Sequence, residues 1–486
     1  WTGPAAKTGA LTFSANQTIT GTLTLTGNSV INRGLVKSSV LGTARTLTAA
    51  IIVVDKIDFE DITGAGAASW DMSAAVGYTG NCGGNSMKAL GDAAFTTAAT
   101  QTATGTVSFT WSTHGWTSRV PLPQDDVVVN NAFGTSQTVT ADMPRLGKSI
   151  DWTGATWTTA LTWAMSTATS IFGSLTMVNS LTMSGTSTYT FAGRGSFTFT
   201  SNALTFERAI TLNAPTGTLT LGGDLTMGVT RRLTITNGTF TVSASNYVIS
   251  TGLLTMSTGT LTLGSATHLI TGTGTTTWNI TGGTLTASTG TIKITDTSTT
   301  AITFVGGGKT YNNVWFSRGA STGNITISGS NTFADFKDDG TAAHSILFTA
   351  GTTQTVTTFT VSGTAGNLIT INSTTTATHS LVKSGGGVID RDYLNIQHSV
   401  ATPASTWNTG NSINNQGVAT AGSGWKFLWI PQARPTESFD AVAQPKSGKS
   451  ARFGIAKLGQ ARFGDTDSFD DTARPAESFD AVARPT

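Results

Sequence analysis

The chain has 486 residues and a formal net charge of +2, and 97 of the residues are Thr. Because Thr is β-branched and favours extended backbone, this composition excludes a mainly helical protein. Charged residues make up only 11% of the chain, which leaves few ionisable groups for catalysis, and their balance provides no basic surface for nucleic acid.

The first 125 residues divide into two predicted segments. Alternating apolar and polar residues at 11–13 and 23–26 predict an N-terminal β segment over residues 1–56. The alternation is lost over residues 57–125, where we expect an irregular cap or insertion. A solenoid needs a cap because its end strands expose unpaired backbone groups.

Tryptophans gather around the end of this irregular segment. Trp111, Trp116, Trp152 and Trp157 are candidate glycan-binding residues, because an exposed group of aromatic rings can stack on sugars. In the alternative interpretation, the same rings fill the end of the solenoid as a hydrophobic plug.

Residues 126–301 carry a repeat of short strands in which apolar residues alternate with Thr. The apolar positions recur at a spacing of about 21 residues, as in Leu204 and Leu225, Leu233 and Leu254, and Leu219, Phe240 and Leu261. A unit this short cannot bury its apolar row until a neighbouring unit stacks on it. The repeat therefore predicts the regular shaft of an all-β protein, a parallel β-helix with coils of about 21 residues and outward-facing Thr.

The last third of the chain contains two further predicted segments. Strand-like runs with less regular spacing over residues 302–430 predict a less regular β-helix and its closure. After Pro431 the charged fraction rises and a motif of Arg-Pro, Glu-Ser-Phe-Asp and Ala-Val-Ala recurs, so we expect residues 431–486 to form an extended docking tail that is too polar to build its own core. The expected assembly and docking residues are Phe439, Phe453, Phe463, Phe469, Phe479, Arg434 and Arg474.

Residues suited to catalysis or metal binding are sparse. Asp390 and Asp392 are the best pair of carboxylates for acid–base catalysis, although Asp in a turn commonly bonds its own backbone and this second role is favoured. The five His residues lack the spacing of metal ligands, so no metal and no cofactor are expected. Thr-x-Thr rows can bind ice when they line one aligned face, but here Thr follows Leu at every coil position, which favours a general outer wall.

Two further features limit the class of protein. Cys82 is the single cysteine, which excludes an intrachain disulfide. The longest apolar run, from Ala49 to Val54, is much shorter than the roughly 20 residues that a membrane-spanning helix needs. We therefore expect no membrane span.

Five stretches have the turns and strands of a coiled β-structure, at residues 118–129, 310–316, 362–371, 392–399 and 423–425. Together with the repeated coils they resemble right-handed parallel β-helix surface proteins, namely secreted bacterial adhesin-like proteins and phage tail-fibre or tailspike-like proteins. The resemblance implies an elongated, non-catalytic display shaft that is extracellular at a cell surface, or part of a virion.

The expected function combines these observations. We expect a non-enzymatic structural or adhesive subunit of an extracellular surface fibre or appendage, which self-associates into a homo-oligomer or filament partly through its C-terminal tail. A glycan or cell-surface receptor is the expected ligand, and nucleic acid is not. Two alternatives stay open: a phage tail-fibre or spike subunit that binds host surface glycan, and a polysaccharide depolymerase built on a β-helix.

Overall fold

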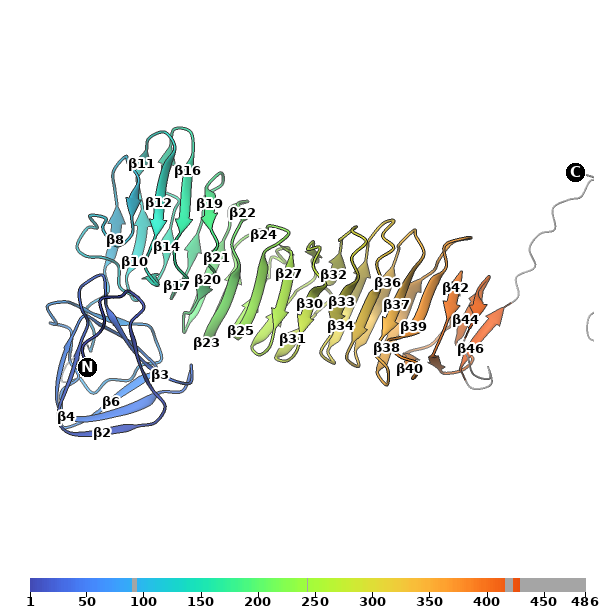
Figure 1. Cartoon of the computed structure of the whole chain (residues 1–486), viewed down its shortest axis with the longest axis horizontal. Helices are drawn as coiled ribbons and strands as arrows, with labels where there is room; N and C mark the ends of the chain where they lie inside the picture. The colour runs from blue at the N-terminus through green and yellow to red at the C-terminus, as the bar shows by residue number, and fades with distance from the viewer. Residues whose placement is uncertain (90–93, 243, 416–422, 429–486) are drawn as a thin grey trace, which may run out of the picture. The chain divides into compact units, whose positions relative to one another are not determined.

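The computed structural model of the chain describes residues 1–89, 94–242, 244–415 and 423–428. In these ranges the regular structure consists of strands β1 to β46 without a helix, and all pairings between these strands are parallel. They form a parallel β-solenoid of the right-handed type, with about 17 turns and a spacing of about 23 residues (Figure 1). This confirms the predicted all-β, β-helical fold.

The first seven strands build a small solenoid with a core of its own. Its two sheets are formed by β1 (Ala10–Phe13), β3 (Gly34–Ser38), β5 (Ile57–Glu60) and β7 (Thr79–Asn81), and by β2 (Gln17–Thr26), β4 (Arg45–Asp55) and β6 (Ile62–Gly66). Val36, Phe59 and Trp70 are fully buried in this core, which is separate from the core of the later coils. The coiling therefore continues through β5 and β6, inside the range in which the sequence pattern predicts irregular structure.

The second solenoid begins at β8 and has three long ladders of strands. The first ladder contains β8 (Thr100–Ala103), β10 (Asp126–Val129), β14 (Ile150–Asp151), β18 (Leu175–Thr176), β21 (Ser196–Thr200), β23 (Ile210–Leu221), β25 (Arg232–Thr241), β28 (Thr260–Thr262) and β31 (Thr284–Thr286). The second ladder shares β23 and β25 and adds β13 (Arg145–Gly147), β17 (Thr169–Ile171), β20 (Tyr189–Phe191), β27 (Leu253–Met256), β30 (Thr276–Ile280), β33 (Ile302–Val305), β35 (Ile325–Ser328), β37 (His344–Phe348), β39 (Ile369–Ser373), β42 (Leu394–Ile396) and β45 (Ile413–Asn414). The third ladder contains β22 (Thr205–Phe206), β24 (Leu225–Met227), β26 (Ile249–Thr251), β29 (Thr267–Ile270), β32 (Thr291–Ile294), β34 (Thr310–Phe316), β36 (Thr332–Asp338), β38 (Thr353–Val361), β40 (His379–Lys383) and β43 (Ser399–Thr402).

Shorter sheets complete the two ends of this solenoid. Near its start they contain β9 (Phe109–Thr110), β12 (Gln137–Ala141), β16 (Leu161–Met165) and β19 (Thr182–Gly185), with β11 (Ala132–Phe133) paired to β15 (Thr156–Trp157). Near its end they contain β41 (Ile389–Asp392), β44 (Trp407–Gly410) and β46 (Trp425–Leu428). The chain divides into two units after Ile430, the position at which its composition changes.

The predicted repeat is present in the middle of the second solenoid. Leu219 is the direct partner of Phe240, and Phe240 of Leu261, so the spacing found in the sequence is the length of one coil there. Elsewhere the coil length varies, because the turns differ in length while the strands stay in register. The coil that brings Trp407 onto Trp425 is shorter, whereas the coil that brings Thr353 onto Ser380 is longer.

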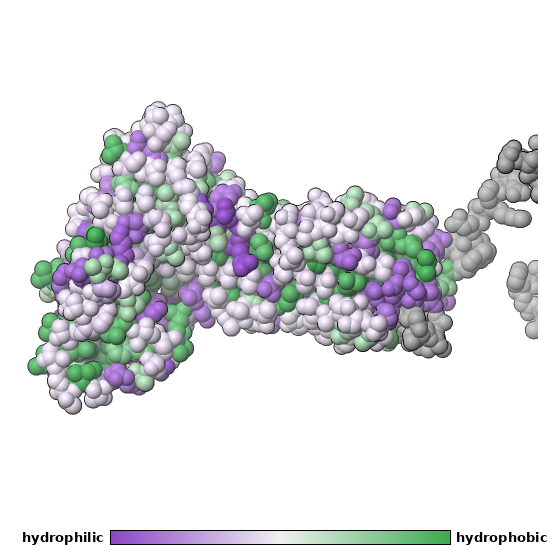
Figure 2. Space-filling view, viewed as in Figure 1, coloured by the Kyte–Doolittle hydropathy of each residue, from purple (hydrophilic) through white to green (hydrophobic). Residues whose placement is uncertain are grey.

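Alternation determines what each strand buries. In β23 and β25 the apolar residues point into the core and the intervening Thr residues face outward, because successive side chains of a strand point to opposite faces. The face of the second solenoid seen in Figure 2 accordingly consists mostly of residues near the middle of the hydropathy scale. Within the described residues, no helix is long and apolar enough to cross a lipid bilayer.

Candidate functional site

A cluster of buried charges lies where the first solenoid meets the second. Asp58 on β5 is 1% exposed and binds two arginines, Arg33 from the loop before β3 and Arg145 from β13. Its Oδ1 accepts from Arg33 Nε at 2.8 Å, and its Oδ2 accepts from Arg145 Nε at 2.6 Å. The second solenoid therefore contributes Arg145 to this ion cluster, and the first solenoid contributes Asp58 and Arg33.

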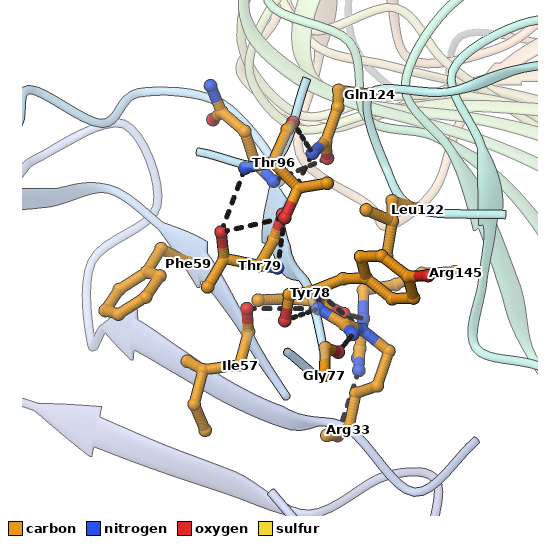
Figure 3. Close-up of polar contacts among 12 residues, drawn as sticks. Arg33, Ile57, Phe59, Gly77, Tyr78, Thr79, Thr96, Leu122, Gln124 and Arg145 are labelled. Carbon is orange, nitrogen blue, oxygen red and sulfur yellow. Dashed lines mark hydrogen bonds and ion pairs between the residues drawn. The ribbon is translucent and has the colours of Figure 1, made fainter. Parts of the chain in front are cut away.

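Backbone carbonyls complete this cluster. Arg33 also donates to the carbonyl oxygens of Gly77 at 2.9 Å, and of Ile57 and Tyr78 at 3.2 Å each (Figure 3). Arg145 Nη2 donates to the carbonyl oxygen of Arg33 at 3.2 Å. A buried guanidinium is tolerated only when its donors are satisfied, and these contacts satisfy those of Arg33.

The charges of the cluster stabilise one another. Burial by itself would raise the pKa of Asp58, but the guanidinium groups of Arg33 and Arg145 outweigh it and hold that pKa below its usual value. Burial would likewise lower the pKa of Arg145, yet the Asp58 carboxylate raises it above the ordinary value. Asp58 and Arg145 are thus charged at neutral pH, and the cluster works as an ionic clamp.

Gln124 fastens the segment between β7 and β8, which leads into the second solenoid. Its Nε2 donates to the carbonyl oxygens of Thr79 and Thr96, both at 2.9 Å, while its Oε1 accepts from the backbone N–H of Asn81 at 2.8 Å (Figure 3). Thr79 and Thr96 also bond each other, since each hydroxyl accepts from the other residue's backbone N–H. These contacts hold the crossing chain against β7.

Three further ion pairs cross between the solenoids. Arg194, between β20 and β21, contacts Asp61 at 2.8 Å and Glu60 at 3.8 Å. Lys7, before β1, pairs with Asp142, which follows β12. The two solenoids are thereby joined at several separate points.

A cleft of about 330 Å³ lies beside the clamp, and several titratable groups line it. Lys37, Glu60, Cys82 and Arg145 are among its lining residues. Burial raises the pKa of the Glu60 carboxyl, with Arg194 opposing the shift, and burial raises the pKa of the Cys82 thiol well above its ordinary value. A protonated thiol is a poor nucleophile, so this cleft offers charge pairing rather than covalent chemistry.

The predicted glycan-binding tryptophans lie mainly in the core. Trp111 and Trp152 are 0% exposed and Trp116 is 8% exposed, while Trp157 on β15 is half-buried and packs against the core. The Trp111 and Trp116 rings pack on each other with centroids 4.8 Å apart. The three buried rings have no free face for a sugar, and their arrangement is that of the hydrophobic plug.

Asp390 and Asp392 both lie on β41, near the end of the second solenoid. Asp390 is exposed and Asp392 half-buried, and their register partners on β44 are Asn408 and Gly410. The intervening Arg391 donates from Nε to the carbonyl oxygen of Phe359. In the part of the chain that the structure describes, no group of three or more His, Cys, Asp or Glu side chains could hold a metal ion.

The predicted docking residues of the tail all lie outside the described residues. They are Phe439, Phe453, Phe463, Phe469, Phe479, Arg434 and Arg474. Their role in assembly therefore stays a prediction.

Aligned hydroxyl columns occur on the outer wall of the second solenoid. One column consists of Ser196, Thr218, Thr239, Thr260 and Thr284, and the other of Thr198, Thr220, Thr241, Thr262 and Thr286. Neighbours in each column are direct register partners on β21, β23, β25, β28 and β31. Since stacked strands lie about 4.8 Å apart, one face of five successive coils presents a regular grid of hydroxyl groups.

No sequence motif marks the ionic clamp. Asp58 lies between two apolar residues, Ile57 and Phe59, in a chain with few charges, and this is the one local signal for it. Its partners are 25 and 87 residues away, so the pairing depends on how the coils meet. Comparison with protein-family models, with curated proteins and with solved structures finds no match for this chain.

Proposed function

We propose that this protein is a non-enzymatic structural or adhesive subunit of an extracellular surface fibre or appendage. The observation that carries the proposal is the ionic clamp, in which both carboxylate oxygens of Asp58 bind arginines from different solenoids. Paired, buried charges of this kind fix one rigid element against another, which a display scaffold needs. The hydroxyl columns supply a hydrogen-bonding wall suited to polar ligands such as glycans.

Self-association is the property to test first. The experiment compares the full chain with a form that ends at Ile430, by light scattering and negative-stain imaging. We expect the full chain to form oligomers or filaments and the shortened form to remain monomeric, because the tail residues are proposed to dock on a second copy. If both forms are monomers at every concentration tested, assembly through the tail is wrong.

A second candidate function is the binding of ice, which the hydroxyl columns favour. Five Thr-x-Thr or Ser-x-Thr rows are aligned on one face, which is the arrangement that ice binding needs, whereas the sequence pattern favours a general outer wall. The test is ice recrystallisation in the presence of the protein, with Thr241→Lys as the matched variant in the middle of the face. Inhibition that is lost in the variant supports this candidate, and the absence of inhibition by the unaltered chain removes it.

A further inference from the structure

A second cleft, of about 270 Å³, lies on the second solenoid between the turns that lead into β23 and β25. Its lining includes Arg208, Arg231 and Arg232, together with the threonines Thr211 and Thr234. The two threonines are direct register partners, so their hydroxyls stand side by side on the outer wall. A strongly hydrophilic patch is visible at the level of β22 to β25 in Figure 2.

Arg208 is the unusual member of this group. It is 4% exposed, and its Nε is buried without a hydrogen-bond partner. Within the described part of the chain its guanidinium makes no hydrogen bond and no ion pair. The other arginines buried to this degree are satisfied: Arg33 binds Asp58, and Arg318 binds the Asp296 carboxylate and four carbonyl oxygens.

The carboxylate of Glu207, which lies near Arg208, is already engaged. Glu207 accepts from Arg231 at 3.2 Å, whereas Arg208 and Arg232 form no ion pair among the described residues. Burial and the positive charge of Arg231 lower the pKa of Arg208, with Glu207 opposing part of the shift. An unpaired buried cation is unfavourable in a folded protein unless an anion compensates it.

We propose that this cleft binds an oxyanion group of the sulfate type, either as the free ion or as a sulfate ester on a saccharide. The planar guanidinium of Arg208 provides paired N–H donors that match such oxygens, and Arg232 adds a second positive charge at the rim. The hydroxyls of Thr211 and Thr234 supply neutral donors on the same wall. This inference does not depend on the proposed fibre function.

The test is isothermal titration of the full chain with sodium sulfate, against sodium chloride at equal ionic strength. We expect one sulfate per chain, and at least tenfold weaker binding in Arg208→Met. Lys148→Gln is the matched control, because it removes one half-exposed positive charge outside the cleft and should leave binding unchanged. Equal sulfate affinity in the unaltered chain and in Arg208→Met, or no binding by either, overturns the proposal.

Thermal unfolding separates this role from a purely structural one. Because Arg208→Met removes an unpaired buried cation, it should raise the melting temperature measured without sulfate. Sulfate should raise the melting temperature of the unaltered chain by binding to it, and this specific increase should be absent in Arg208→Met. The general stabilisation by sulfate is measured in the variant itself. A melting temperature that falls in Arg208→Met while the sulfate-specific increase persists would show that Arg208 only supports the fold.

The source of the oxyanion is decided by a second titration. A sulfated oligosaccharide is compared with its desulfated form and with free sulfate. Binding of the sulfated form at least tenfold tighter than sulfate, together with no binding of the desulfated form, assigns the site to sulfated saccharides. Equal affinity for sulfate and for the sulfated saccharide assigns it to the free ion.

Discussion

Removing the carboxylate of the ionic clamp should loosen the first solenoid from the second. In Asp58→Asn, the guanidinium groups of Arg33 and Arg145 stay buried but lose their counter-charge. Removing one partner of a buried ion pair costs about 3–5 kcal/mol. If the first solenoid unfolds as one unit of roughly 90 residues, its melting temperature should fall by on the order of 10–30 °C.

Differential scanning calorimetry is the suitable assay, because it resolves separate transitions of the two solenoids. We expect the lower transition to shift while the transition of the later coils stays in place. Asp126→Asn is the matched control, since its carboxylate is half-exposed and its ion pair with Lys148 spans 4.0 Å, so its effect should stay within about 1 kcal/mol. A shift in Asp58→Asn no larger than in the control would refute the clamp.

Acid should reproduce the effect of this substitution. The pKa of Asp58 is lower in the folded chain than its ordinary value, so its stabilisation is fully present above the ordinary pKa. It is lost as the pH falls through the folded value. The lower transition should therefore fall more steeply with pH below about 4 in the unaltered chain than in Asp58→Asn, where Asp55 and Asp71, whose pKa values are also lowered, keep some sensitivity to acid.

Three further predictions concern the core and the wall of the second solenoid. Burial lowers the pKa of His379 from 6.5 to about 3, so between these pH values the unfolded chain binds a proton that the folded chain does not. The free energy of unfolding should therefore decrease as the pH falls below 6.5, by about 2 kcal/mol at pH 5. Urea titrations of His379→Phe should not show this decrease. Phe336 is 1% exposed and packs against four aromatic rings. Chemical denaturation should show that Phe336→Ala lowers the free energy of unfolding by about 3–5 kcal/mol and that Phe336→Leu lowers it clearly less. Equal losses in the two variants would contradict the packing argument. The ammonium groups of Lys293 and Lys337 lie over the Trp315 ring, at 3.7 and 3.9 Å from its centroid. Trp315→Leu should therefore lower the free energy of unfolding by about 1–2 kcal/mol. If the same substitution costs less in a chain in which both lysines are replaced by Met, the difference measures the cation–π contribution.

Parts of the candidate sites could be predicted from the sequence, and parts could not. The aligned hydroxyls follow from Thr-x-Thr spacing, because a fixed coil length places like residues above one another. The sequence leaves two interpretations of Trp111 and Trp152, since a Trp ring suits a core and an exposed platform equally well, and the structure shows both residues in the core. Nothing in the local pattern distinguishes the paired Arg145 from the unpaired Arg208.

The sequence by itself determined the fold class and the stacking of individual residues. Alternation with a period of two fixes which side chains face the core, and the regular recurrence of apolar positions fixes that Phe240 lies above Leu219. These are local properties, so they can be recognised within one or two coils.

The tertiary structure alone decided where the first solenoid ends, how it meets the second, and which charges pair there. Asp58 and Arg145 are 87 residues apart, and their encounter depends on two preformed surfaces docking side by side. The same holds for Arg208, whose burial is set by the turns of neighbouring coils. Side-by-side docking and turn packing leave no periodic trace in a sequence, because each occurs once in the chain.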